Sequence, residues 1–164
     1  MEVDVLEKLS ETLGTQLAAK HLKVATAESC TGGMVAVALT AIPGSSDYFE
    51  RGFVTYSNEA KHEMLGVPLA LIDKHGAVSE EVAIAMAQGA LEHSHADVTV
   101  SITGIAGPDG GTKAKPIGTV WFGLSSKAGL VKSHQSCFEG NRDQIRCSAA
   151  EYAVNLLIEI TKRT

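Results

Sequence analysis

A serine hydroxyl and a lysine amine in this sequence form a pair that could carry out nucleophilic catalysis. Ser29 lies between a β-like run, 22–26, and an apolar, helix-like run, 34–39. At such a junction backbone N–H groups are unpaired and the helix dipole favours developing negative charge, which suits a nucleophile. A serine hydroxyl needs a base to take its proton, and Lys61 can be that base if burial or nearby positive charge lowers its pKa. The alternatives are that Ser29 or Thr31 caps the helix and that Lys61 is a solvated helix residue.

Other side chains that could do chemistry have no partner at a recognisable spacing. Cys30 is the rival nucleophile, but no histidine spacing assigns it a base, and a buried free cysteine is the commoner state. His93 and His95 form an H-x-H pair at the end of a predicted helix, where their side chains point apart, so we predict no metal site. Arg142 and Arg146, near the start of the last predicted helix, are either phosphate ligands or exposed helical residues.

A glycine-rich loop follows the β-branched run 98–103. Residues 104–112 contain four glycines and a proline, which indicates a backbone that turns sharply or comes close to a ligand. The loop has neither the Gly-Lys-Ser/Thr of a Walker A motif nor the G-x-G-x-x-G dinucleotide fingerprint. Thr103 immediately precedes it, where its hydroxyl could serve a site or simply favour the β conformation.

The periodicity of apolar residues predicts alternating helices and strands. Leucines at 6, 9, 13 and 17 predict a first helix over roughly 3–20. Strands are expected over 22–28, 49–56, 98–103, 117–125 and 130–138. Further helices are expected from about 31, after an N-cap at Ser57, from Ser79 to about His93, and after a capping box formed by Asn141 and Gln144.

This alternation predicts an α/β fold with three layers, α/β/α, around a mixed, partly parallel sheet. In such folds ligands bind at the carboxyl ends of the strands. Three loops qualify: the loop at Ser29, the loop at Tyr56 and Ser57, and the glycine-rich loop after Thr103. Tyr56 on its own fits a half-buried strand aromatic as well as a site residue. The convergence of the loops favours a site at Ser29 over a simple helix cap.

Composition limits the classes of protein to consider. A length of 164 residues predicts one domain, 1–164, with an ordinary 45% hydrophobic and 20% charged residues. The net charge of −5, without a run of Lys and Arg, argues against nucleic-acid and membrane partners. No apolar stretch approaches the roughly 18 residues that span a bilayer, and the N-terminus does not look like a signal peptide. Three separated cysteines suit a reducing compartment, so we predict a cytoplasmic protein.

From about residue 6 to 160 the chain resembles the CinA C-terminal domain family, whose characterised members are nicotinamide-nucleotide amidases. Six blocks in the same order carry the resemblance: AESCTGG at 27–33, PGSS at 43–46, GFVTYSNEAK at 52–61, HGAVS at 75–79, SITGIAGPDGG at 101–111 and KPIGTVW at 115–121. The likeness is to the stand-alone form of the domain, since the chain starts at the first helix. It implies hydrolysis of nicotinamide mononucleotide to nicotinate mononucleotide and ammonia, a salvage step in pyridine-nucleotide recycling, without a cofactor or metal.

The resemblance also implies roles for individual residues. Ser29 matches the family's nucleophile, Lys61 its general base, and Tyr56 a hydroxyl near them. Thr103 matches a polar residue at the head of the glycine loop, and Arg142 is the candidate for the substrate phosphate, within the chain or across a subunit interface. The expected substrate-binding residues, with backbone N–H groups around 30–33 stabilising the oxyanion, are Cys30, Thr31, Gly32, Gly33, Thr103, Gly104, Gly107 and Arg142.

Two other functions stay open at this point. The glycine loop could hold a phosphate in a non-catalytic nucleotide-binding or regulatory module, or the serine could hydrolyse a different amide or ester. A small-molecule nucleotide is the expected partner. Because small α/β enzymes are often symmetric oligomers, we also expect a homo-oligomer.

Overall fold

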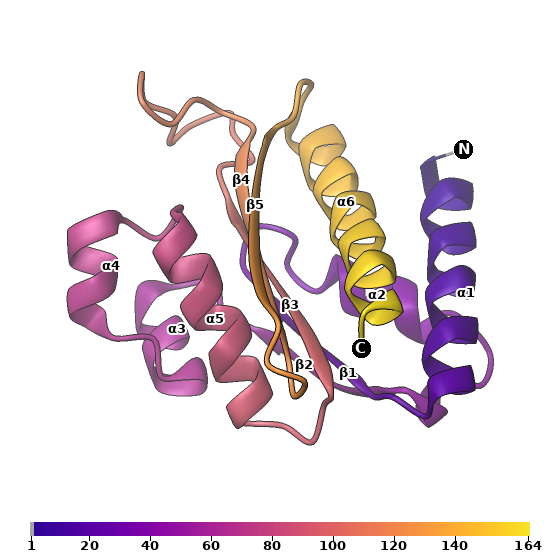
Figure 1. The fold of residues 1–164 in the computed structure, drawn as a ribbon. Coiled ribbons are helices and arrows are strands. Elements are labelled where there is room, and N and C mark those ends of the chain that lie inside the picture. The colour runs from indigo at the N-terminus through magenta and orange to yellow at the C-terminus, as the bar shows by residue number, and fades with distance from the viewer. Residues whose placement is uncertain (1) are drawn as a thin grey trace.

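The computed structural model describes residues 2–164, in which five strands form one mixed sheet of order β2-β1-β3-β4-β5 (Figure 1). Strand β1 is parallel to both of its neighbours, β2 and β3, whereas β4 is antiparallel to both β3 and β5. The strands are β1 (Val24–Glu28), β2 (Phe49–Val54), β3 (Val98–Gly104), β4 (Thr119–Ser126) and β5 (Val131–Cys137). The predicted α/β fold with a mixed sheet is confirmed.

Helices cover both faces of this sheet (Figure 1). On one face lie α1 (Glu2–Lys20), α2 (Met34–Thr40) and α6 (Arg142–Lys162); on the other lie α3 (Asn58–Leu65), α4 (Leu69–His75) and α5 (Glu80–Glu92). A 3₁₀ helix (Ser45–Asp47) precedes β2. The larger core lies under α1, α2 and α6, and a smaller one, centred on Met86, lies under the other three helices.

Apolar and hydroxyl-bearing residues alternate along β3 because its two faces have different neighbours. Its apolar positions 98, 100 and 102 are fully buried in the larger core. Its hydroxyls face α5, and each donates to a backbone carbonyl: Thr99 to Ala87 at 2.7 Å, Ser101 to Ala83 at 2.5 Å and Thr103 to Ala77 at 2.8 Å. A buried hydroxyl needs such a partner, so these residues attach the sheet to α5 and to the loop before it.

Local sequence signals place most helix ends correctly. Ser57 and Ser79 accept hydrogen bonds from the third residue of their helices, and Asn141 with Gln144 forms the predicted capping box. Helix α2 begins at Met34 rather than near residue 31, because residues 32 and 33 are glycines with left-handed φ of +57° and +101°. Helix α4 was not predicted: it begins directly after the Gly66–Pro68 break that ends α3.

Candidate active site

The three predicted loops surround a cavity of about 220 Å³ at the carboxyl ends of β1, β2 and β3. Ser29 follows β1, Tyr56 follows β2, and Thr103 lies at the end of β3. Helices α3 and α6 add Lys61 and Arg142. The complete lining is Ser29, Cys30, Tyr56, Asn58, Lys61, Ala77, Val78, Thr103, Gly104, Ala106 and Arg142. The sequence analysis did not select Asn58, Ala77, Val78 or Ala106, although all four fall inside its quoted blocks.

Ser29 and Lys61 are in direct contact. The Nζ of Lys61 lies 3.0 Å from Ser29 Oγ, and both side chains are buried, at 1% and 7% exposure. Local structure explains the contact, because Ser57 caps α3 and so places Lys61 in its first turn, over the end of β1. The structure therefore brings together two residues that lie 32 positions apart in the sequence.

The surroundings of Lys61 favour its neutral form. Burial lowers the pKa of the Lys61 amine from its ordinary value. Within residues 2–164 no carboxylate forms an ion pair with it. Its other contacts are the backbone carbonyls of Thr55 and Tyr56, each 3.0 Å from Nζ. In the structure Nζ donates to these two carbonyls and to Ser29 Oγ. A neutral amine would keep two N–H groups for the carbonyls and turn its lone pair toward the Ser29 hydroxyl, as a general base requires.

Cys30 lines the same cavity but is a poor candidate nucleophile. Its side chain is 5% exposed, and burial raises the pKa of the thiol to about 12. The thiolate, not the thiol, is the reactive species. Ser29 is therefore the better nucleophile of the two neighbours.

A buried carboxylate supports the turn that carries Ser29. Glu28, fully buried, accepts hydrogen bonds from the Thr31 hydroxyl at 2.6 Å and from the backbone N–H groups of Val35 and Ala36 at 3.0 Å each. Gly33, the N-cap residue of α2, offers no side-chain cap. Glu28 thus caps α2 from the preceding strand, which neither Ser29 nor Thr31 does. The sequence signal was a charged residue at the end of a buried strand.

Because Glu28 caps α2, some backbone N–H groups near Ser29 are not available to stabilise an oxyanion. Two N–H groups in the first turn of α2 already bond to its carboxylate. Thr31, Gly32 and Gly33 are not among the lining residues of the cavity. Within the described part of the chain, the N–H of Cys30 has no backbone acceptor, and Cys30 lines the cavity. The N–H of the residue after a nucleophile is a common oxyanion donor, so Cys30 is the best placed of the four predicted residues.

The two arginines near the start of α6 have different positions. Arg142 lines the cavity, and its guanidinium donates to the Gly107 carbonyl at 2.7 Å and to the Tyr56 hydroxyl at 3.2 Å. Gly107 itself lies outside the lining. Arg146 lies one turn further along α6 and donates to the carbonyls of Cys30 and Thr31, at 3.0 and 3.3 Å. Arg142 is the arginine that a ligand in the cavity can reach.

Close packing explains the first glycine of the predicted loop. A Cβ at Gly104 would lie 2.7 Å from a methyl carbon of Val120 and 2.9 Å from the Thr119 carbonyl oxygen. Strand β4 therefore leaves no room for a side chain there. Beyond this point the segment between β3 and β4 extends away from the layered body of the molecule (Figure 1).

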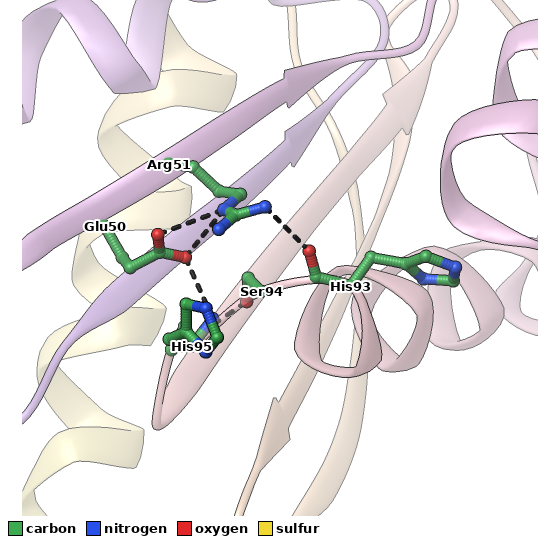
Figure 2. Close-up of polar contacts among 6 residues, drawn as sticks. Glu50, Arg51, His93, Ser94 and His95 are labelled. Carbon is green, nitrogen blue, oxygen red and sulfur yellow. Dashed lines mark hydrogen bonds and ion pairs between the residues drawn. The ribbon is translucent and has the colours of Figure 1, made fainter.

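The H-x-H pair is not part of the cavity lining, and Figure 2 shows its surroundings. His93 and His95 point apart, the former bonding the Gly89 carbonyl through Nδ1 and the latter donating its backbone N–H to Glu50. Arg51 joins this cluster through Glu50 and the His93 carbonyl. Among the described residues no group of three His, Cys, Asp or Glu side chains could hold a metal ion.

Comparison with protein families matches the chain to the CinA C-terminal domain over residues 6–161. The nicotinamide-nucleotide amidohydrolase PncC of Escherichia coli (strain K12) is 54% identical over 152 residues, which cover 93% of this chain and 92% of that protein. The CinA-like protein of Geobacter sp. (strain M21) is 52% identical, but the match covers only 36% of its length.

Solved structures of the same superfamily share the fold. The competence/damage inducible protein CihA from Agrobacterium tumefaciens superposes with a TM-score of 0.94 at 43% identity, covering 95% of each chain. The CinA superfamily protein KP700603 from Klebsiella pneumoniae gives 0.92 at 34% identity, covering 97% of this chain and 99% of that one. Among the described helices, none is both long and apolar enough to cross a membrane.

Proposed function

The chain belongs to the CinA C-terminal domain family, and we propose that it hydrolyses the carboxamide of nicotinamide mononucleotide by a Ser29–Lys61 mechanism. Its class as a hydrolase follows from amidohydrolase relatives that are 52–54% identical over most of the chain. The observation that carries the mechanism is the 3.0 Å contact between the Lys61 amine and the Ser29 hydroxyl in a cavity at the strand ends. The product, nicotinate mononucleotide, would return to pyridine-nucleotide synthesis.

Acylation begins with a proton transfer. The neutral Lys61 amine takes the proton of Ser29 while Oγ attacks the carboxamide carbon. The carbonyl oxygen becomes an oxyanion, which the N–H of Cys30 can stabilise. A single donor of this kind is worth about 3 kcal/mol of barrier. Lys61 then gives its proton to the leaving nitrogen, the C–N bond breaks, and ammonia departs, leaving the nicotinoyl ester on Ser29.

In deacylation a water molecule is the nucleophile and Ser29 is the leaving group, while Lys61 again acts first as base and then as acid. Lys61, neutral again, takes a proton from a water molecule, and the hydroxide equivalent attacks the ester carbon. The same oxyanion donor serves this step. Collapse of the intermediate breaks the bond to Ser29 Oγ, and Lys61 returns the proton to it. Nicotinate mononucleotide leaves, and both side chains regain their starting states.

The charge of the cavity fits a phosphorylated substrate. Of the described residues that line it, Lys61 and Arg142 are the basic ones and none is a carboxylate, so with Lys61 neutral the cation is Arg142. Lys61 is buried and used in catalysis, whereas Arg142 lies beside Tyr56, which is 62% exposed. A guanidinium at the exposed edge of the cavity can bond two oxygens of a phosphate. The Tyr56 ring gives an aromatic surface next to it.

The test of this function is ammonia release from nicotinamide mononucleotide by the purified protein, with free nicotinamide, nicotinamide riboside and a simple aromatic amide run in parallel. We expect turnover of the mononucleotide and much slower turnover of the others. Binding of the mononucleotide in calorimetry without ammonia release would instead indicate a non-catalytic nucleotide-binding module. Faster release from the aromatic amide would indicate a hydrolase of another substrate.

Replacing Arg142 by alanine should weaken binding of the phosphorylated substrate. Loss of a charge-assisted bond costs about 1.5–3 kcal/mol, so we expect KM for nicotinamide mononucleotide to rise roughly 10- to 100-fold, with a smaller change in kcat. Steady-state kinetics with the mononucleotide and the riboside would check this, because the riboside has no phosphate and should lose little. Equal losses for both substrates would contradict the phosphate role.

A further inference from the structure

We infer that Arg146, which does not line the cavity, is a positioning residue that holds the Ser29 turn in its reactive shape. This inference rests on the proposed function, since it concerns the same serine. The guanidinium reaches from α6 to two consecutive carbonyls, those of Cys30 and Thr31, at 3.0 and 3.3 Å. These carbonyls belong to the turn that joins Ser29 to α2.

The shape of that turn decides where its N–H groups point. A trans peptide holds its C=O and N–H in opposite directions. Bonding of the Cys30 carbonyl to Arg146 therefore turns the N–H of Thr31 away from α6. The Ser29 carbonyl accepts from the N–H of Gly32 at 3.0 Å, which fixes the peptide that carries the Cys30 N–H. The Thr31 carbonyl, which accepts from Arg146, shares a peptide with that Gly32 N–H. Arg146 is thus linked through this peptide to the one that carries the proposed oxyanion donor.

Arg146 is one of two supports on opposite ends of the turn. Glu28 bonds the Thr31 side chain and the N–H groups at the start of α2. Arg146 bonds the carbonyls of Cys30 and Thr31, the two residues that follow Ser29. Gly32 adjoins the guanidinium, since a Cβ there would lie 3.1 Å from an Nη atom of Arg146. A planar guanidinium can bond two neighbouring carbonyls at once, which the single ammonium of lysine cannot do in the same geometry.

These contacts also argue against direct binding of the substrate by Arg146. Its Nε and one Nη are used by the turn, and the residue is absent from the described cavity lining. A ligand of the phosphate would act mainly on KM, as expected for Arg142. A residue that orients the nucleophile and the oxyanion donor acts mainly on kcat, because its effect is largest in the transition state.

The experiment compares R146A, R146K and R51A with the wild-type enzyme. Arg51, on β2 and outside the cavity lining, is the matched control, since its guanidinium also bonds a backbone carbonyl, that of His93 at 3.0 Å (Figure 2). For R146A we expect kcat to fall about 10²- to 10³-fold, as for loss of an oxyanion donor, with KM changed less than threefold. R146K should lie between, and added guanidinium ion should restore part of the R146A activity.

Labelling of Ser29 by a fluorophosphonate provides a readout that needs no nucleotide. It should slow in R146A as kcat does, and remain at the wild-type rate in R51A. If R146A does not fold, the kcat and labelling rate of R146K decide the question alone. Wild-type values of both in R146K, or in R146A, would overturn the inference, as would a rise in KM at constant kcat. Absence of ammonia release from the wild type would overturn the proposed function instead.

Discussion

Changing Ser29 to alanine is expected to lower ammonia release from nicotinamide mononucleotide by about 10⁴-fold or more, since loss of a nucleophile removes the acyl-enzyme route. Ser29 is the hydroxyl in contact with the Lys61 amine, and the thiol next to it stays protonated because burial raises its pKa to about 12. Cys30 therefore cannot take over the role. Ammonia release under saturating substrate is the measurement.

The matched control for this variant is Ser46→Ala, which removes an exposed hydroxyl from the 3₁₀ helix before β2. It should keep wild-type turnover. Calorimetry should show that S29A still binds the mononucleotide, because the substitution removes little of the cavity wall. Turnover by S29A above about a tenth of the wild-type rate would remove Ser29 from the nucleophile role, since nucleophile losses are far larger than this.

Changing Lys61 to methionine should abolish turnover and raise stability at the same time. The side chain is 1% exposed and burial lowers its pKa, so the folded state holds an amine in an environment that disfavours its charged form. Methionine has a similar length and no charge to desolvate. We expect kcat to fall at least about 10³-fold and the free energy of unfolding to rise by about 1 kcal/mol, which is roughly 2–4 °C in Tm.

The control for stability is Lys74→Met, on the exposed side of α4, which should change Tm little. The gain from K61M should also depend on pH in a defined direction. Between the lowered pKa of Lys61 and its ordinary value of 10.5 the unfolded chain binds more protons than the folded one, so wild-type stability rises with pH in that window. The advantage of K61M is therefore largest below the lowered pKa and disappears above 10.5. A constant advantage at all pH values would contradict the burial argument.

The catalytic rate of the wild type should follow the same titration. Below its pKa the amine carries a proton and cannot accept another from Ser29, so kcat/KM should rise with pH until Lys61 is neutral. The midpoint of this limb should lie below the ordinary 10.5 of lysine.

The sequence predicted the fold and the place of the cavity because these depend on local patterns. Alternating helices and strands specify a layered α/β domain, and loops at the carboxyl ends of neighbouring parallel strands must lie together. Ser57, as an N-cap, also fixed the start of α3 and so the reach of Lys61. The contact of Lys61 with Ser29 could not be predicted from the sequence, because it depends on the register in which β1 and β2 pair.

Other features depend on long-range contacts that no local pattern encodes. Glu28 looked like the polar end of a strand, yet it caps the following helix across a turn of two glycines. Arg146 looked equivalent to Arg142, and only the packing of α6 against the Ser29 turn separates them. Helix α4 follows a proline and has only seven residues, about two turns, which is too short for an amphipathic pattern to be recognised.

The carbonyls that hold the Lys61 amine belong to the backbone of residues 55 and 56. No amino-acid substitution removes a backbone carbonyl, so the proposed activation of Ser29 by Lys61 depends little on side-chain variation around it. The rim of the cavity, by contrast, consists of replaceable side chains such as Tyr56, Asn58, Val78 and Arg142. Divergence toward other amides can therefore proceed by changing the rim alone, and an engineer seeking a new amidase on this scaffold would randomise those four positions first.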